Sequence, residues 1–303
     1  MGCYLNNYNF MENIIIGIDL GGSKIAAAAA DQSGNIVSEI IVPTEAEHGR
    51  KKVISNIEKA IAHLKASTKA NILKIGIGVP GPINYETGMV ISPPNLPGWK
   101  KVNLKEILSN FYNAPVFVDN DANCAALGEA LFGAGKKATN FIFITVSTGI
   151  GGGIIINKNI YRGATGSAGE FGHMIIDPSG PRCGCGNKGD LEALASGTSI
   201  KKRSGEDAMA IHIKAQQGDK KAKKIIYKTA HYLGVGIANL VNIFNPELVI
   251  VGGGLSNMGA LLLKPTIKEF KKYVLPLPGK SVKIVRAKLG ARAGLLGAVA
   301  LCL

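Results

Sequence analysis

The feature that most constrains this chain is an internal repeat of two apolar strands joined by a glycine turn. The segment NIIIGIDLGGSKIAAAAADQSGNIV has the same plan as TNFIFITVSTGIGGGIIINKNIYRG, about 130 residues further on, and aligning them places Asp19 opposite Ser147. Each copy has an apolar strand, a turn of glycine and hydroxyl residues, a second apolar strand and a polar turn. Two copies of one such unit predict a duplicated fold with two similar lobes. The length of 303 residues agrees, because one hydrophobic core rarely grows beyond ~250–300 residues.

The rest of the chain alternates between apolar strands and helices. NILKIGIGVPG, APVFVDND and PELVIVGGGLS have the short apolar runs of buried strands, whereas DANCAALGEALFGAG and RAGLLGAVALCL have helical spacing. This alternation predicts the α/β class. We expect an extension over residues 1–12, an N-terminal lobe over 13–120, and a C-terminal lobe over 121–290, with a helix within 291–303 returning to the first lobe.

The composition excludes several classes of protein. Hydrophobic residues make up 46% and charged residues 18% of the chain, which is typical of a globular protein rather than a disordered one. No apolar run is long enough to span a membrane, and the N-terminal residues lack the pattern of a secretory signal. The five cysteines are too few for a disulfide framework. We therefore expect a cytoplasmic protein with no membrane partner.

The net charge of +14 raises the question of a nucleic-acid partner. The lysine clusters are spread along the chain, without interleaved aromatic residues and without the frame of a helix-turn-helix or zinc finger. They are typical of solvated helix faces in a basic protein. We therefore expect no nucleic-acid partner, although a positive field favours anionic substrates such as ATP.

The two glycine turns are candidate phosphate sites. DLGGSK and STGIGGG place small residues between two strands, so that backbone N–H groups can approach a phosphate closely, and Ser23 or Thr148 can add a hydroxyl donor. Either turn alone could be a plain hairpin turn, but two in duplicated positions favour phosphate binding. The later loop VGGGLS follows a strong strand and could receive the sugar or base of a nucleotide.

Two further segments carry polar groups at suggestive positions. DNDAN, at Asp119–Asn123, ends a strand and starts a helix, where a carboxylate is stabilised by the helix N-terminus; simple N-capping is the alternative. GEFGHMIIDPSGPRCGCGNKGDLE combines a histidine with a Cys-x-Cys pair, as in a metal loop, but lacks an obvious last ligand. From the residues alone it is a decayed metal loop, a loop with an oxygen ligand, or no metal site.

The motifs DLGGSK, NDAN, STGIGGG, GEFGH and CGCGNKGDLE, in this order, resemble those of the ROK family (repressors, open reading frames and sugar kinases). The resemblance extends from Asn13 to the C-terminus. It implies a two-lobed actin/hexokinase-like (ribonuclease H-like) fold, an interlobe cleft, and ATP-dependent phosphorylation of a hexose hydroxyl.

The resemblance also implies roles for individual residues. Asp121 would be the general base that accepts the proton of the sugar hydroxyl, with Asn120 binding the sugar beside it, whereas Asp119 matches no catalytic position. Further sugar contacts would come from Gly81, Asn95, Glu170, His173 and Glu192. The ATP phosphates would be held by the glycine turns, with Asp19 near Mg²⁺; the residues concerned are Asp19, Gly21, Gly22, Ser23, Lys24, Thr148, Gly149, Gly253 and Gly254.

Relatives bind a structural Zn²⁺ through one histidine and three cysteines. His173, Cys183 and Cys185 match three of these ligands, but Asp190 stands at the third cysteine position. Because zinc accepts an Asp oxygen, we expect a zinc site of His173, Cys183, Cys185 and Asp190. The alternatives are zinc held by three residues and water, or no metal.

The CGCG spacing and the segment SPPNLPGW resemble those of the family's glucokinases, so we expect glucose to be converted to glucose 6-phosphate, a step of glycolysis. An N-acetylmannosamine or N-acetylglucosamine kinase is the nearest alternative. A sugar-responsive repressor is another, but only about a dozen residues precede the first expected strand, too few for a helix-turn-helix. By resemblance we also expect a homodimer or homotetramer.

Overall fold

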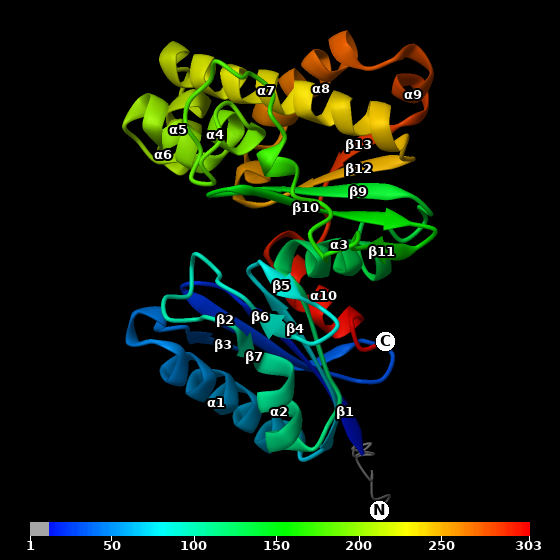
Figure 1. The fold of residues 1–303 in the computed structure, drawn as a ribbon. Coiled ribbons are helices and arrows are strands. Elements are labelled where there is room, and N and C mark those ends of the chain that lie inside the picture. Colours follow the sequence, from blue (N-terminus) through cyan, green and yellow to red (C-terminus); the bar gives the residue numbers. More distant parts are fainter. Residues whose placement is uncertain (1–11) are drawn as a thin grey trace, which may run out of the picture. The chain divides into compact units, whose positions relative to one another are not determined.

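The computed structural model describes residues 12–303 and divides the chain into two compact units (Figure 1). Unit 1 contains the chain up to Cys124 together with Gly294–Leu303, and unit 2 contains Ala125–Ala293. The chain passes between the units inside two helices, α3 (Asp121–Leu131) and α10 (Ala293–Ala300). The expected extension over residues 1–12 lies, apart from residue 12, outside the described part of the chain.

Unit 1 is built on a five-stranded sheet with the order β3-β2-β1-β4-β8. Strands β1, β4 and β8 are parallel, whereas β2 and β3 pair antiparallel at one side. The strands are β1 (Asn13–Leu20), β2 (Lys24–Ala30), β3 (Ile36–Pro43), β4 (Asn71–Val79) and β8 (Val116–Asn120).

Helices cover both faces of this sheet, as the alternation along β1 requires. Ile14 and Ile16 pack against the face covered by α1 (Arg50–Thr68) and α2 (Leu104–Tyr112), whereas Ile15 points to the opposite face and meets α10. Gly76 in β4 lets α10 approach, because a Cβ there would lie 1.9 Å from the carbonyl oxygen of Ala298. A small sheet of β5 (Ile83–Asn84), β6 (Met89–Val90) and β7 (Val102–Asn103) completes the unit.

Unit 2 repeats the plan of unit 1. Its five-stranded sheet has the order β11-β10-β9-β12-β13, with β9, β12 and β13 parallel and β10 and β11 antiparallel. The strands are β9 (Phe141–Val146), β10 (Ile150–Ile156), β11 (Asn159–Tyr161), β12 (Leu248–Gly252) and β13 (Lys283–Arg286). Because each strand occupies the same place as its counterpart in unit 1, the duplication predicted from the glycine turns is confirmed, and so is the α/β class.

The two faces of the second sheet have separate cores. Ile142 and Ile144 pack on the face covered by the long helix α7 (Lys220–Phe244) and its neighbours, whereas Phe141 and Phe143 pack against the middle and second half of α3. The helices of this unit are α4 (Leu191–Ala195), α5 (Gly197–Ser204), α6 (Ala208–Gln216), α7 (Lys220–Phe244), α8 (Ala260–Tyr273) and α9 (Pro276–Ser281).

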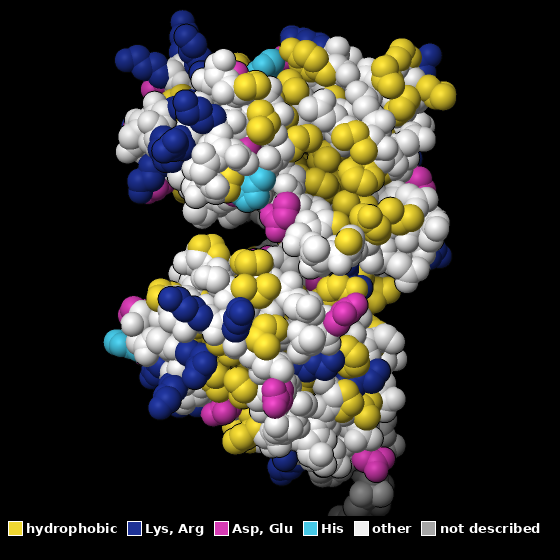
Figure 2. Space-filling model, in the orientation of Figure 1, with side chains coloured by type: hydrophobic (Ala, Val, Ile, Leu, Met, Phe, Trp, Pro, Cys, Tyr) yellow, Lys and Arg dark blue, Asp and Glu magenta, His cyan; other side chains and the backbone are white. Residues whose placement is uncertain are grey.

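The surface of unit 2 is uneven in character. Lys and Arg side chains gather over α5, α6 and the start of α7, whereas apolar side chains are exposed near the end of α7 and around α9, where Ile243 and Leu277 are 69% and 82% exposed (Figure 2). Within residues 12–303, no helix combines the length and the apolar character that crossing a membrane requires.

Candidate functional site

In unit 1 the candidate residues meet at one edge of the sheet. The parallel strands β1, β4 and β8 end side by side, and the register pairs Asp19 with Gly78, and Gly78 with Asp119. Carboxyl ends of parallel strands are the usual place for ligand sites in α/β proteins. The structure therefore brings the segments DLGGSK, VPGP and DNDAN together at one edge of the sheet.

Neighbouring carboxylates in DNDAN have different surroundings. Asp119 is buried, and its Oδ1 accepts hydrogen bonds from the Asn120 N–H (2.7 Å) and the Asn123 amide (2.9 Å), so it fixes the turn into α3. Asp121, the first residue of α3, is exposed, and its Oδ1 lies 2.8 Å from the backbone nitrogen of Ala122. Asp121 is thus the carboxylate of this pair that a substrate can reach.

The predicted sugar contacts of unit 1 lie close to these strand ends. A Cβ on Gly81 would lie 3.1 Å from the amide nitrogen of Asn120, so a larger residue at position 81 would press on that side chain. A Cβ on Gly22 would lie 3.0 Å from the Cβ of Asn95. The loop carrying Asn95 therefore packs on the glycine turn between β1 and β2.

Backbone and hydroxyl contacts hold that glycine turn. The Gly21 N–H donates to the Lys24 carbonyl (3.0 Å), and the Thr44 hydroxyl donates to the Gly21 carbonyl (2.7 Å). Ser23 and Lys24 are exposed at its tip. Thr44, which sequence analysis did not single out, is thus part of the support of the turn.

Asp19 stands at the end of β1, before this turn. Burial raises the pKa of its carboxyl group, and the charge of Lys24 acts in the opposite direction. A Cβ on Gly294, in the first turn of α10, would lie 2.6 Å from Oδ2 of Asp19. The carboxylate therefore packs tightly against the start of α10.

Unit 2 holds a cavity of about 380 Å³ beside its own glycine turn. Thr148 and Gly254, both expected to contact ATP, line this cavity. Apart from Ser147 and Leu255, which belong to the candidate glycine loops, the other lining residues were not predicted: Gly197, Thr198, Lys201, Asp207, Ala208, Met209, His212, Asn257 and Met258. The lining residues come from the turn after β9, from α5, from α6 with its N-cap Asp207, and from the turn after β12.

Hydrogen bonds from α5 hold the turn between β9 and β10. The Gly197 N–H donates to the Ser147 carbonyl (2.7 Å), and both the N–H and the hydroxyl of Thr198 donate to the Thr148 carbonyl (3.1 and 2.8 Å). Gly253 packs against β9, where a Cβ would lie 2.4 Å from the Val146 carbonyl oxygen. Cavity and turn thus form one rigid arrangement.

Polar side chains in the cavity are held in pairs. Lys201 and Asp207 form an ion pair at 3.0 Å, and Asn257 accepts a hydrogen bond from Arg286. A partly open pocket with an apolar lining and a few polar groups can serve as a small-molecule site.

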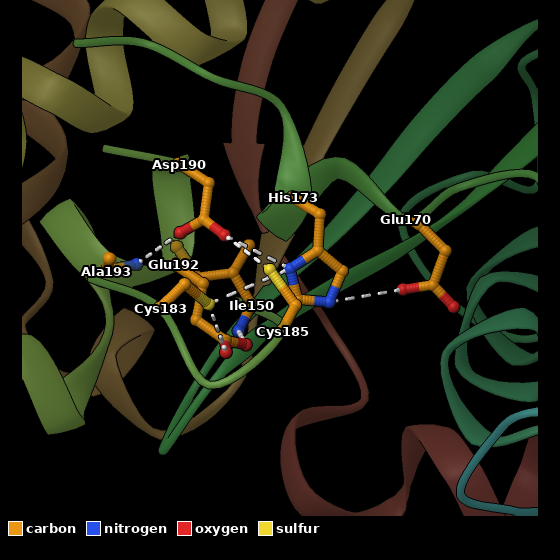
Figure 3. A network of polar contacts seen from close by, with 8 residues as sticks. All are labelled: Ile150, Glu170, His173, Cys183, Cys185, Asp190, Glu192 and Ala193. Atoms are coloured by element: carbon orange, nitrogen blue, oxygen red, sulfur yellow. Dashed lines mark hydrogen bonds and ion pairs between the residues drawn. The ribbon is translucent and has the colours of Figure 1, made fainter. Parts of the chain in front are cut away.

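Four residues of unit 2 form a candidate metal centre (Figure 3). One nitrogen, two sulfur and one oxygen atom, from His173, Cys183, Cys185 and Asp190, all lie within 4.8 Å of one another. Asp190 Oδ2 lies 3.3 Å from both the Cys185 thiol and His173 Nδ1, and Cys183 Sγ lies 3.9 Å from the same nitrogen. The structure therefore brings together the four ligands expected from the sequence.

The buried carboxylate of Asp190 has two distinct contacts. Its Oδ1 accepts a hydrogen bond from the Ala193 N–H (2.8 Å) as the N-cap of α4, which leaves Oδ2 facing the cluster. Burial by itself would raise the pKa of Asp190, but hydrogen bonds from the nearby thiols, His173 and Ala193 outweigh it and lower the pKa. Burial, aided by the neighbouring Asp190, raises the pKa of Cys183 to about 12.

The two ring nitrogens of His173 face different partners. Nδ1 points to Asp190, whereas Nε2 lies 4.0 Å from the exposed carboxylate of Glu170 (Figure 3). A single imidazole can therefore serve the cluster on one side and a different ligand on the other.

Glu192 lies between the cluster and the glycine turn. Its Oε2 accepts a hydrogen bond from the Ile150 N–H (2.8 Å), and its Oε1 lies 3.8 Å from the Cys183 thiol. Sequence analysis assigned Glu192 to the sugar and did not foresee its contact with the turn.

Comparison with known proteins gives a consistent result. A model of the ROK family matches residues 15–303. The glucokinase of Halalkalibacterium halodurans is 38% identical over 308 residues, covering 93% of this chain and 92% of that protein. The xylose repressor of Caldicellulosiruptor bescii is 36% identical over 310 residues, covering 95% of this chain and 77% of the repressor.

Among solved structures, the ROK family glucokinase from Streptomyces griseus in complex with glucose and AMPPNP is similar, with a TM-score of 0.81 and 35% identity, covering 95% of this chain and 98% of that one. Family model, relatives and fold agree with the order of the motifs in the sequence. The chain therefore belongs to the ROK family.

Proposed function

We propose that this protein is an ATP-dependent hexose kinase that converts glucose to glucose 6-phosphate. The observation that carries the proposal is the position of Asp121, an exposed carboxylate at the end of a parallel strand, beside a carboxylate that is buried and structural. The similarity to glucokinases over nearly the whole chain supports the same function.

Asp121 acts as the general base. In phosphoryl transfer the protein mainly positions the reactants and stabilises charge, and a carboxylate accepts the proton of the attacking hydroxyl. Asp119 cannot take this role, because its Oδ1 is occupied by two hydrogen bonds and its side chain is buried.

The nucleotide is bound by the glycine turns and the cavity of unit 2. The cavity of about 380 Å³ suits the base and sugar of ATP, since small-molecule pockets span ~300–1,000 Å³. Backbone N–H groups of the turn at Ser147–Gly149 and of the turn at Gly21–Lys24 bind the phosphates. Gly254 lines the cavity, and Gly253 packs against β9 beside the first of these turns.

Mg²⁺ would be held by Asp19. Its carboxylate lies at the end of β1 next to the glycine turn, and hard cations such as Mg²⁺ prefer carboxylate oxygen. When bound, the ion neutralises charge that develops on the transferred phosphoryl group.

The residues proposed to bind the sugar occur in two groups along the chain. Gly81, Asn95 and Asn120 contribute from the strand ends of unit 1. From unit 2, Glu170 and His173 Nε2 face each other and can each bind a sugar hydroxyl, with Glu192 as a further contact.

The cluster of His173, Cys183, Cys185 and Asp190 would hold a structural zinc ion. Two sulfurs, one nitrogen and one carboxylate oxygen are a donor set that Zn²⁺ accepts in tetrahedral geometry, and their mutual proximity fits a single ion. The ion would hold the loop that carries Glu192 and fix the ring of His173. A zinc content below about 0.2 per chain, in protein purified without chelator, would exclude this site.

Replacing Asp121 tests the proposed function. We expect Asp121→Asn to lower kcat for glucose phosphorylation by about 10²–10⁴-fold, with a small change in the KM for glucose, as measured by coupled ADP release. Asp31→Asn is the matched control, because Asp31 only stabilises its own turn through bonds to Ser33 and Asn35. A variant Asp121→Asn with unchanged kcat would refute the role of this residue, and a wild-type protein without turnover would refute the kinase.

The choice of hexose is tested with a substrate panel. Glucose, mannose, fructose and the N-acetylhexosamines should be compared by kcat/KM in the same assay, and we expect glucose to be preferred. A higher kcat/KM for N-acetylmannosamine or N-acetylglucosamine would assign the chain to the alternative kinase class.

A repressor is the second candidate, because a xylose repressor matches 95% of this chain at 36% identity. Retention of DNA that changes with sugar, in a protein without ATP turnover, would favour it. We propose the kinase, acting in the cytoplasm and in glycolysis without a nucleic-acid or membrane partner. We also propose that it forms a homodimer or homotetramer, which light scattering after size-exclusion chromatography can measure.

A further inference from the structure

We propose that Glu192 is a positioning residue that couples occupancy of the metal cluster to nucleotide binding. This inference rests on the metal and nucleotide sites proposed above. Its starting point is that one side chain touches both sites, with Oε2 on the Ile150 N–H and Oε1 near the Cys183 thiol (Figure 3).

On the nucleotide side, Glu192 shapes the glycine turn directly. Its Oε2 lies 2.3 Å from where a Cβ on Gly149 would be, so the turn and the carboxylate approach each other closely. The same oxygen receives the first backbone N–H of β10 at 2.8 Å. The position of the carboxylate therefore sets the path of the chain from Gly149 into β10.

On the metal side, Glu192 is attached through α4. Asp190 is both the N-cap of this helix and a member of the cluster, and Glu192 follows it by two residues. Helix α4 has only five residues, and a helix that short is not stable on its own. An ion bound by Asp190 would hold the N-terminus of α4 in place, and this would hold the side chain of Glu192 in position.

The expected sign of the coupling is positive. A metal-loaded cluster orders α4 before the nucleotide arrives, so the nucleotide no longer has to supply that ordering. Coupling between two sites is reciprocal, and AMPPNP should therefore strengthen zinc binding by the same factor by which zinc strengthens AMPPNP binding.

The experiment measures both halves of this cycle in the full-length chain without sugar. The Kd of AMPPNP is measured by calorimetry on zinc-loaded and zinc-depleted protein, and the Kd of zinc by competition with a chelator, with and without AMPPNP. We expect a coupling factor of about 5–20 in both directions.

Three variants test whether Glu192 links zinc binding to nucleotide binding. Glu192→Ala should bring the factor within twofold of one, whereas Glu192→Gln, which keeps an acceptor for the Ile150 N–H, should retain most of it. Glu170→Ala is the matched control, because Glu170 faces the other nitrogen of His173 and has no contact with the turn in the described structure; its factor should equal that of the wild type. Thermal melting of each variant verifies that it is folded.

If wild-type protein binds zinc but has the same Kd for AMPPNP with and without it, the inference is overturned. A coupling factor in Glu192→Ala equal to that of the wild type would also overturn it. A protein that binds no zinc would overturn it together with the metal site. None of these three results would affect the kinase proposal, which depends on glucose phosphorylation by the wild type.

Discussion

Asp190 combines two contacts in one side chain. A cysteine at this position could bind a metal but would be a poor helix cap. The aspartate instead gives Oδ1 to the Ala193 N–H and leaves Oδ2 for the cluster. The same side chain is thus a helix cap and a proposed metal ligand.

The two contacts of Asp190 can be separated by mutation. Asp190→Asn keeps a good N-cap but loses the charge, so we expect zinc affinity to fall about 10–100-fold while the metal-free protein melts close to the wild type. Asp190→Ala should lose zinc and also about 1 kcal/mol of stability from the lost cap. Chelator competition and thermal melting without metal measure the two effects, and equal melting of both variants would contradict the capping role.

The carboxylate of Asp19 should support Mg²⁺-ATP binding but lower the stability of the folded chain. Burial holds the pKa of its carboxyl group above the ordinary value in the folded chain, so the free energy of unfolding falls as pH rises from that ordinary value through the folded-state pKa. At pH values above the folded-state pKa, the buried carboxylate is charged and lowers the free energy of unfolding by its full amount. Asp19→Asn should therefore raise the melting temperature at pH 7 in the absence of nucleotide, while Mg²⁺-ATP binding is lost.

Asp31 provides a control, because its pKa is shifted in the opposite direction from that of Asp19. Hydrogen bonds, first among them that from the Asn35 side chain, lower the pKa of Asp31, so its contribution to stability is present at neutral pH and lost as pH falls. Asp31→Asn should not raise the melting temperature at pH 7. A lower melting temperature for Asp19→Asn than for the wild type would contradict the prediction that the buried carboxylate of Asp19 lowers stability.

At the scale of elements, the sequence predicted most of what lies at the strand ends. Apolar runs that end in glycine or aspartate marked β1, β4, β8 and β12, and α3 begins at Asp121 as its spacing indicated. Helices α5 and α6 were not predicted individually from the sequence. Lys201 belongs to a basic cluster that is typical of a solvated face, and nothing local shows that tertiary packing turns it toward a cavity.

The close approach of α10 to the first sheet gives a stability prediction. In Gly76→Ala the new Cβ would meet the Ala298 carbonyl oxygen at 1.9 Å and Cys302 Sγ at 3.0 Å, so α10 must move. We expect a loss of about 3 kcal/mol in the free energy of unfolding by urea. Gly184→Ala is the matched control, because its Cβ would have no atom within 4 Å; similar losses in both variants would contradict the packing argument.

At the scale of the whole molecule, the two units differ in how the chain builds them. Unit 2 is one continuous segment with its own cores, whereas unit 1 needs the last ten residues of the chain, Gly294–Leu303. The repeat of the glycine turns predicted the two similar lobes. It could not predict that each crossing between them lies inside a helix, because the apolar spacing of α3 continues unchanged past Cys124.

This difference predicts the behaviour of fragments. Residues 121–293, which keep α3 whole, should fold and bind AMPPNP, because every residue that lines the cavity belongs to them, but should not phosphorylate glucose. Residues 1–124 should not fold, since Ile15 and Ala30 lose their packing against Val299 and Cys302. Circular dichroism and calorimetry test both statements; a folded 1–124 fragment, or a 121–293 fragment without AMPPNP binding, would contradict them.

The packing of α10 on β1 and β4 also has a consequence for biosynthesis. At roughly 5–20 residues per second, the ribosome needs about 10–45 s to travel from Gly76 to Ala298. During that interval α10 has not been synthesised, so the face of the first sheet that contains Gly17 and Gly76 lacks its packing partner. A chaperone that associates with translating ribosomes should therefore occupy this nascent chain until translation terminates.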